Sequence, residues 1–139
     1  MTLTIREVMT ETPVTMDAKA SIGDAARCMR DDDIGDVLVT DGEKLYGVVT
    51  DRDLVVRAMA KQQDLEQTAV GSIASRSMVT VAPDDAVDHA VHVMRTHALR
   101  RLPVVDGERL VGIVSLGDLA REKDPTSALA DISAAEPNA

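Results

Sequence analysis

The chain has 139 residues and a formal net charge of −9, and 45% of its residues are hydrophobic. This length suits one compact domain or two small fused halves, and the acidic balance argues against duplex DNA or an anionic membrane surface as the main partner. Tyr46 is the only aromatic residue, which disfavours single-stranded nucleic acid, and Cys28 is the only cysteine, which excludes a disulfide within the chain.

The first half of the chain opens with signals for two helices. Residues 4–10 predict a short helix capped by Thr4 and Glu7, and residues 13–16 predict an extended segment. Ser21 is the expected N-cap of a second helix, which should end near Arg30 because the three acids at 31–33 oppose the helix dipole. Its predicted apolar face consists of Ile22, Ala25, Ala26 and Met29.

A hairpin and a third helix follow. Residues 34–40 and 45–49 predict two strands, joined by a turn at Asp41 and Gly42. Residues 51–61 predict a helix that carries more apolar side chains than one buried stripe uses, which favours a homodimer. These side chains are Leu54, Val55, Val56, Ala58 and Met59.

The second half repeats this plan after a linker at 62–69. When residues 5–54 are laid on residues 70–119 without a gap, 14 of the 50 positions are identical, where chance would give roughly three. The repeat predicts a short helix at 70–75, extended segments at 79–81, 102–105 and 110–114, and a final helix from about 116. The helix after Pro83 should bury Val87, Ala90, Val91 and Met94, and residues 122–139 should form a loose tail.

Both copies share a motif where the last strand meets the last helix. Gly47 is followed by Thr50 and Asp53, and Gly112 by Ser115 and Asp118. The hydroxyl and the carboxylate can simply cap the helix and complement its dipole. They can also stand at the open end of a strand, where ligands of α/β units bind, with the carboxylate accepting hydrogen bonds from ribose hydroxyls.

The repeat, this motif and the two Asp-Gly turns together resemble a pair of CBS domains, the Bateman module, of the stand-alone bacterial type. The resemblance implies an α/β fold of two tandem β-α-β-β-α repeats, residues 5–61 and 70–121, packed through their sheets with pseudo-twofold symmetry. It also implies clefts between the repeats that commonly bind AMP, ADP, ATP, S-adenosylmethionine or NAD. Members of this kind form homodimers and are linked to stress responses.

Carried over by position, the resemblance assigns ribose to the two hydroxyl–carboxylate pairs. It assigns the base to the segments around residues 14–15 and 79–80 and to the strand starts near Ile34 and Leu99. Phosphate needs donors, and the sequence offers nearby arginines. Asp36 stands where the second copy has Arg101, so the clefts should differ, and we expect a nucleotide to prefer the one with Ser115 and Asp118. The full set of expected ligand-binding residues is Val14, Thr15, Ile34, Thr50, Arg52, Asp53, Val79, Thr80, Leu99, Arg100, Arg101, Ser115 and Asp118.

The function that follows is regulatory: a ligand-sensing protein that passes nucleotide occupancy to an unknown protein partner. The alternative is a constitutive interaction dimer without a small ligand. We expect no enzyme activity and no required cofactor, because no Ser or Cys is arranged with a His and no Gly-rich phosphate loop occurs. We expect no metal, because His89 and His92 lie opposite the apolar face of their helix. No stretch approaches about 20 apolar residues and no signal peptide is evident, which predicts a cytoplasmic protein.

Overall fold

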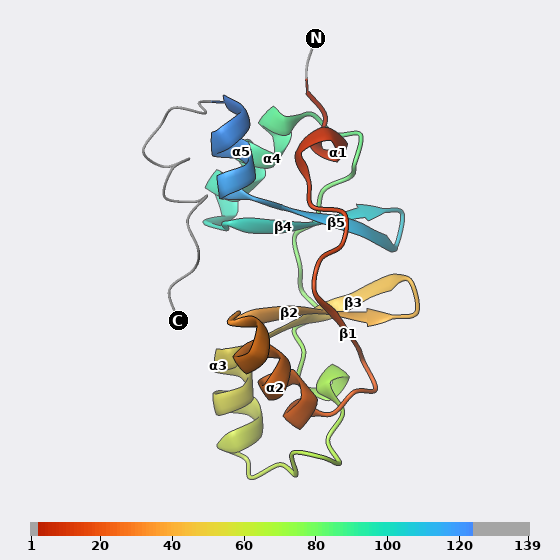
Figure 1. The fold of residues 1–139 in the computed structure, drawn as a ribbon, viewed down its shortest axis with the longest axis vertical. Coiled ribbons are helices and arrows are strands. Elements are labelled where there is room, and N and C mark those ends of the chain that lie inside the picture. The colour runs from red at the N-terminus through yellow and green to blue at the C-terminus, as the bar shows by residue number, and fades with distance from the viewer. Residues whose placement is uncertain (1–2, 124–139) are drawn as a thin grey trace. The chain divides into compact units, whose positions relative to one another are not determined.

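The computed structural model describes residues 3–123, and these residues form two compact units. One unit is continuous and spans residues 14–78. The other combines residues 3–13 with residues 79–123. The units therefore differ from the sequence repeats, because the short opening segment of each repeat belongs to the unit of the other repeat (Figure 1).

In the unit of residues 14–78, strands β1, β2 and β3 lie side by side in a sheet, and helices cover one face of it (Figure 1). Strand β1 is parallel to β2, and β2 is antiparallel to β3. The helices α2 and α3 lie against the same face, and α3 continues directly into the π-helix η1. The bounds are β1 Thr15–Asp17, α2 Ile22–Asp32, β2 Asp36–Asp41, β3 Lys44–Thr50, α3 Asp51–Asp53, η1 Leu54–Met59 and the 3-10 helix η2 Val70–Ser72.

The other unit follows the same plan. Strands β4 and β5 form an antiparallel hairpin, and Val81 bridges Val104 in parallel, as β1 does with β2. Helices α4 and α5 cover one face of this hairpin, and α1 joins them from the N-terminal segment (Figure 1). The bounds are α1 Ile5–Val8, α4 Val87–His97, β4 Arg101–Asp106, β5 Arg109–Ser115 and α5 Leu116–Lys123.

Each unit has its own core of aliphatic and methionine side chains. In the first, Met29 of α2 packs with Val37 and Val39 of β2. In the second, Met94 of α4 packs with Leu102 and Val104 of β4. The two methionines are 7% and 4% exposed, which confirms the prediction that they occupy equivalent buried positions.

The buried faces of the two long helices differ slightly from the predicted ones. Ala26 is exposed and Val91 is only partly buried, whereas Val93 is buried. With about 100° between successive residues, the buried stripe centres on Ala25 and Ala90, so the position that follows each of them lies at the stripe's edge. The predicted face was therefore wrong at Ala26 and Val91, whereas the other three predicted positions are buried in each helix.

Several boundaries also differ from the sequence expectation. Ser21 caps α2 as predicted, but the helix continues to Asp32 and ends at Asp33, which adopts a left-handed conformation at φ 55°. Near its end Arg30 pairs with Asp31 at 2.8 Å, which offsets part of the acidic charge. The last helix runs to Lys123, so residues 122 and 123 of the predicted loose tail are helical, and the remainder lies outside the described residues.

The two hairpin turns confirm their prediction. Gly42 and Gly107 have φ of 64° and 66°, a backbone conformation that glycine adopts without steric cost. Each hairpin also shifts register at one equivalent place, between Val39 and Thr40 in the first and between Val104 and Val105 in the second. The repeat is thus preserved to the level of a single strand irregularity.

The third helix is the clearest departure between the copies. The predicted helix at 51–61 begins at Asp51, but it is π-helical from Leu54 and ends at Met59. Its wider turn appears in the hydrogen bond from the backbone N of Ala60 to the carbonyl of Val55, at 2.9 Å. The corresponding helix α5 is α-helical.

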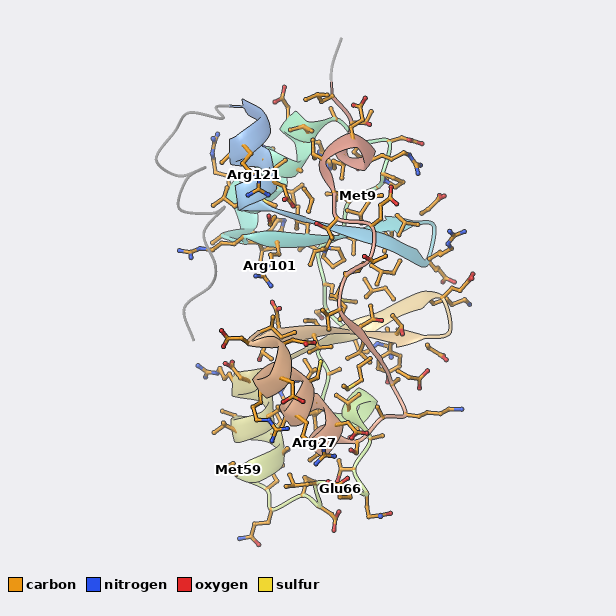
Figure 2. The ribbon with its side chains drawn as sticks, in the orientation of Figure 1. Met9, Arg27, Met59, Glu66, Arg101 and Arg121 are labelled. Atoms are coloured by element: carbon orange, nitrogen blue, oxygen red, sulfur yellow. The ribbon has the colours of Figure 1, made fainter. Side chains whose placement is uncertain are left out.

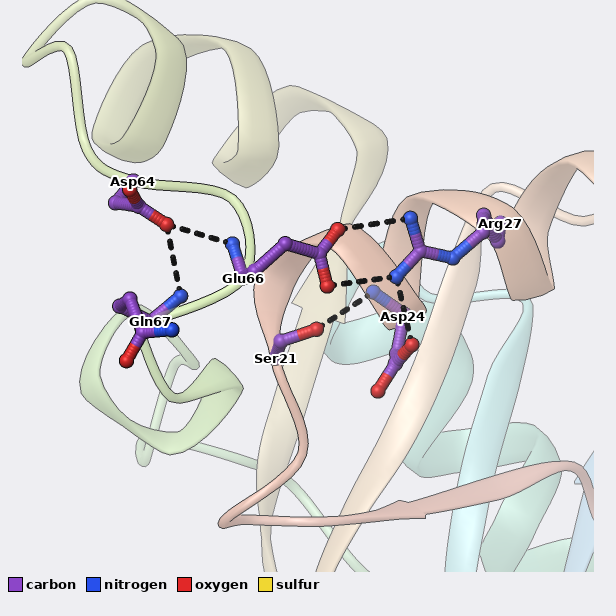
Figure 3. Close-up of polar contacts among 6 residues, drawn as sticks. All are labelled: Ser21, Asp24, Arg27, Asp64, Glu66 and Gln67. Carbon is purple, nitrogen blue, oxygen red and sulfur yellow. Dashed lines mark hydrogen bonds and ion pairs between the residues drawn. The ribbon is translucent and has the colours of Figure 1, made fainter.

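The linker at 62–69 is fastened to α2 rather than loose. Arg27 donates two hydrogen bonds to Glu66, at 3.0 and 3.1 Å, and one to Asp24 at 2.8 Å (Figure 3). The backbone N of Gly23 donates to the carbonyl of Leu65 at 2.8 Å. A Cβ at Gly23 would lie 2.9 Å from the backbone carbonyl oxygen of Leu65, closer than a Cβ normally approaches, so glycine suits this position. The linker therefore satisfies donors at the start of α2.

Candidate functional site

The hydroxyl–carboxylate pair of the first copy forms a reciprocal cap where β3 meets α3. The backbone N of Asp53 donates to Thr50 Oγ1 at 3.1 Å, and the backbone N of Thr50 donates to Asp53 Oδ2 at 2.9 Å. The Asp53 side chain is only 15% exposed. Two backbone donors are thus satisfied together, and the carboxylate is held in one orientation.

The second copy repeats this geometry where β5 meets α5. The backbone N of Asp118 donates to Ser115 Oγ at 3.1 Å, and the backbone N of Ser115 donates to Asp118 Oδ2 at 2.9 Å. The Asp118 side chain is 14% exposed. Capping therefore accounts for both members of the pair in both copies, and it leaves one carboxylate oxygen, Oδ1, for other partners.

The partner of that second oxygen differs between the copies. Arg121 Nη2 lies 2.6 Å from Asp118 Oδ1, a charge-assisted hydrogen bond. Arg57 Nε lies 3.6 Å from Asp53 Oδ1, beyond hydrogen-bonding distance, and Arg57 Nη1 donates instead to the carbonyl of Ile73 at 3.1 Å. The sequence analysis missed both arginines, although an Arg three or four residues after an Asp on a helix is a recognisable pairing signal.

The starts of the middle strands lie beside these caps. The backbone N of Asp51 donates to the carbonyl of Gly35 at 2.9 Å, and that of Leu116 to the carbonyl of Arg100 at 2.7 Å. Ile34 precedes Gly35, and Leu99 precedes Arg100; both are partly buried just after the left-handed C-caps of α2 and α4. Each predicted base-lining position near a strand start thus lies close to the predicted ribose pair of the same copy.

The charges next to the two caps are opposite. Asp36 is the strand partner of Thr50, and Arg101 is the strand partner of Ser115. The predicted difference between the copies therefore falls directly beside the two hydroxyl groups. Arg52, Arg100 and Arg101 are exposed.

The remaining predicted residues lie at the beginnings of the extended segments. Val14 and Thr15 are exposed, and Thr15 pairs with Leu38 in β1 and β2. Val79 is partly buried and Thr80 is exposed, just before the bridge at Val81. By unit, Val14, Thr15, Ile34, Thr50, Arg52 and Asp53 belong to residues 14–78, whereas Val79, Thr80, Leu99, Arg100, Arg101, Ser115 and Asp118 belong to the other unit.

Other reactive side chains within residues 3–123 form no second site. Cys28 is partly buried, and burial raises the pKa of its thiol, as does the nearby Asp32 carboxylate. His89, His92 and His97 are exposed. Among residues 3–123, no three His, Cys, Asp or Glu side chains are grouped so that they could hold a metal ion. The same residues contain no helix long and apolar enough to cross a membrane.

Comparison with known proteins defines the class. The family model of the CBS domain matches this chain twice, at residues 5–59 and 70–124. The chain therefore belongs to the CBS-domain family and carries two CBS domains in tandem, as the sequence repeat predicted. Its mixed α/β fold is that of CBS-domain pairs.

Individual relatives cover nearly the whole chain. The uncharacterized protein YlbB of Bacillus subtilis is 38% identical over 135 residues, which are 93% of this chain and 90% of that protein. The crystal structure of Hypoxic Response Protein I with two coordinated zinc ions has a TM-score of 0.77 and 32% identity, covering 86% of this chain and 98% of that one. The CBS domain pair of protein MJ0100, in complex with 5-methylthioadenosine and S-adenosyl-L-methionine, has a TM-score of 0.72 and 26% identity, covering 91% and 100%.

Proposed function

We propose that this protein is a regulatory sensor that binds an adenosine-containing nucleotide and signals its occupancy to a protein partner. The observation that carries the proposal is the pair of part-buried carboxylates, Asp53 and Asp118. Each is held in one orientation where the last strand of its CBS domain meets the following helix. The MJ0100 pair, of the same family, binds two adenosine compounds. The ligand classes are AMP, ADP, ATP, S-adenosylmethionine and NAD, and the protein requires no cofactor and is not an enzyme.

Each group in the site has a distinct task. The carboxylate oxygen that is not used by the cap accepts a hydrogen bond from a ribose hydroxyl, and the low exposure of the side chain strengthens that bond. The base lies against the apolar and threonine side chains at the strand starts. Exposed guanidinium groups meet the phosphates. The residues are Val14, Thr15, Ile34, Val79, Thr80 and Leu99 for the base and Arg52, Arg100 and Arg101 for phosphate.

The surface that contacts a partner is the exposed aliphatic face of η1. Val55, Val56 and Met59 are 53%, 50% and 68% exposed on η1, and Figure 2 shows Met59 near the end of this segment that is farthest from β3. An exposed aliphatic face of this kind supports self-association. We assign it to a homodimer in the cytoplasm, and the name of Hypoxic Response Protein I supports a role in a stress response.

A nucleotide screen tests the proposal. A ligand present at 100 times its dissociation constant stabilises the folded state by about 2.7 kcal/mol, which raises the unfolding temperature. AMP, ATP, S-adenosylmethionine and NAD are compared with GMP in thermal unfolding and calorimetric titration. Binding of at least one adenosine compound is expected, with loss of binding in the double variant Asp53→Ala, Asp118→Ala. Absence of any binding at millimolar ligand would contradict the proposal.

A constitutive interaction dimer is the second candidate. It is favoured by the capping geometry, because the reciprocal caps account for both members of each pair without a ligand. The two candidates differ in one measurement. The unfolding temperature of a constitutive dimer does not respond to nucleotide, whereas that of the sensor rises.

A further inference from the structure

The two caps have the same internal hydrogen bonds but differ in the partner of the second carboxylate oxygen, Oδ1. In both copies Oδ2 accepts from a backbone N at 2.9 Å, so the cap fixes both carboxylates to the same degree. Orientation of the carboxylate therefore does not depend on an arginine. Arg57 and Arg121 therefore matter through whether each of them forms a hydrogen bond to Oδ1.

In the second copy the arginine occupies Oδ1. The 2.6 Å contact from Arg121 Nη2 is short even for a charge-assisted bond, and Arg121 projects from α5 (Figure 2). A ribose hydroxyl that donates to Asp118 must compete with a guanidinium for the same oxygen. The competitor is charged and intramolecular, so it is always present at the site.

In the first copy the arginine does not form a hydrogen bond to Oδ1 of the carboxylate. Arg57 donates to the carbonyl of Ile73 at 3.1 Å, and its Nε stays 3.6 Å from Asp53 Oδ1. Within the described residues, Oδ1 of Asp53 accepts no hydrogen bond, although a positive charge stands close by. It is therefore an oriented, part-buried acceptor that is ready for a donor from a ligand.

From this contrast we infer that Arg121 is a specificity-determining residue that closes the Asp118 site, so that the ribose of an adenosine compound binds first at Asp53. The inference rests on the proposed function. It reverses the preference that the positions of Arg100 and Arg101 suggest in the sequence. Those arginines act on phosphate, whereas Arg121 acts on the acceptor of the ribose, which every ligand of this class must use.

The test compares the two carboxylates in calorimetric titrations with adenosine and with AMP. Asp53→Ala should weaken the first binding event by more than about tenfold, because a charged acceptor is lost. Asp118→Ala should change it by less than about twofold. The two variants remove equivalent caps, so each controls for the other's effect on folding, and circular dichroism melts confirm that both are folded at the titration temperature.

A second set of variants tests the arginine itself. In the Asp53→Ala background, Arg121→Gln should strengthen the remaining binding by about fivefold, the upper range for an exposed ion pair. Arg30→Gln in the same background is the matched control, because it removes an equal charge whose partner, Asp31, lies on α2. It should produce no gain.

The outcomes separate the inference from the proposed function. If the parent binds adenosine compounds but Asp118→Ala is the damaging variant, or if Arg121→Gln gives no gain over Arg30→Gln, the assignment to Asp53 is overturned while the proposed function stands. If neither the parent nor any arginine variant binds adenosine, AMP or any other adenosine compound of the nucleotide screen, both are overturned.

Discussion

The single thiol of the chain illustrates how the environment of one residue sets its chemistry. Cys28 is partly buried on α2, and its Sγ lies 3.6 Å from Asp32 Oδ2. Burial, and then the Asp32 carboxylate, raise the pKa of the thiol, which lowers the thiolate fraction at neutral pH. Cys28 is therefore suited to packing rather than to nucleophilic or redox chemistry.

We predict that Cys28 reacts slowly with a thiol-specific disulfide reagent at neutral pH. The rate should be at least about tenfold below that of the chain unfolded in denaturant, because both the thiolate fraction and access are reduced. Asp32→Asn should increase the rate, since it removes a negative charge that opposes ionisation. A native rate equal to the unfolded rate would show that the thiol is neither shielded nor shifted.

A second residue-scale prediction concerns acid stability. The hydrogen bond from Arg27 lowers the pKa of Asp24 below its usual 3.8. A carboxyl group whose pKa is lowered in the folded state stabilises that state above its unfolded pKa, and this contribution is lost as the pH falls through the folded pKa. Asp24 should therefore contribute fully at neutral pH and progressively less below pH 3.8.

The variant Asp24→Asn isolates this contribution, because it keeps the shape of the side chain and removes its charge. Thermal unfolding midpoints of the parent and the variant are compared from about pH 6 to about pH 2.5. The parent should be more stable at the upper end, and the difference should shrink below pH 3.8. A difference that does not change with pH would contradict the role of the ionised carboxylate.

At the scale of elements, the two long helices are matched structural probes. Met29 and Met94 occupy equivalent positions and are both buried, in separate cores. We predict that replacing either by Ala lowers the free energy of unfolding by about 2–5 kcal/mol, through lost burial and a new cavity. Urea unfolding followed by circular dichroism measures this. Met59→Ala is the control, because Met59 is largely exposed and should cost far less.

The same elements show why most of the fold could be predicted from sequence. Ser21 acts locally as a helix cap, and the two turn glycines, Gly42 and Gly107, act locally through positive φ. These residues therefore determine a helix start and two turns whatever the tertiary packing is. The gap-free repeat then transfers each assignment to the other copy. Ala26 and Val91 were misassigned because periodicity identifies an apolar stripe but does not say where its buried part ends.

The candidate site was predictable in its residue types but not in its contacts. The hydroxyl and carboxylate pairs follow from the motif, and both form the predicted caps. The arginine contacts depend on helix geometry. Arg57 lies four residues after Asp53 on a segment that becomes π-helical, and Arg121 lies three residues after Asp118 on an α-helix. The residue types do not distinguish the π-helix from the α-helix at these two places, so the sequence did not predict the difference in Oδ1 partners.

At the scale of the molecule, the exchange of opening segments between units is the feature with the largest consequence. Ile5 is fully buried in the core formed by α4, β4 and β5, although it opens the first repeat in sequence. Val70 is fully buried in the core formed by α2, β2 and β3, although it opens the second repeat. Neither unit has a complete core without a segment from the other repeat. Each CBS domain expressed alone would lack a short helix and the buried residues that come with it, which are Ile5 in one case and Val70, Ile73 and Ala74 in the other.

The exchange predicts an effect that crosses the repeats. Ile5→Ala removes buried volume from the unit formed by residues 3–13 and 79–123. The free energy of unfolding should fall by about 2–5 kcal/mol. Hydrogen–deuterium exchange followed by mass spectrometry should then show faster exchange in peptides from α4, β4 and β5, with little change in α2, β2 and β3. Val70→Ala, at the equivalent position, should give the reverse pattern. Tyr46 fluorescence provides a second readout, because Tyr46 is the only aromatic residue and belongs to the unit of residues 14–78. The Arg76 guanidinium carbon lies 3.7 Å from the centre of its ring. This fluorescence should respond to Val70→Ala and not to Ile5→Ala.

Faster exchange confined to residues 14–61 in Ile5→Ala would show that the opening helix belongs to its own repeat.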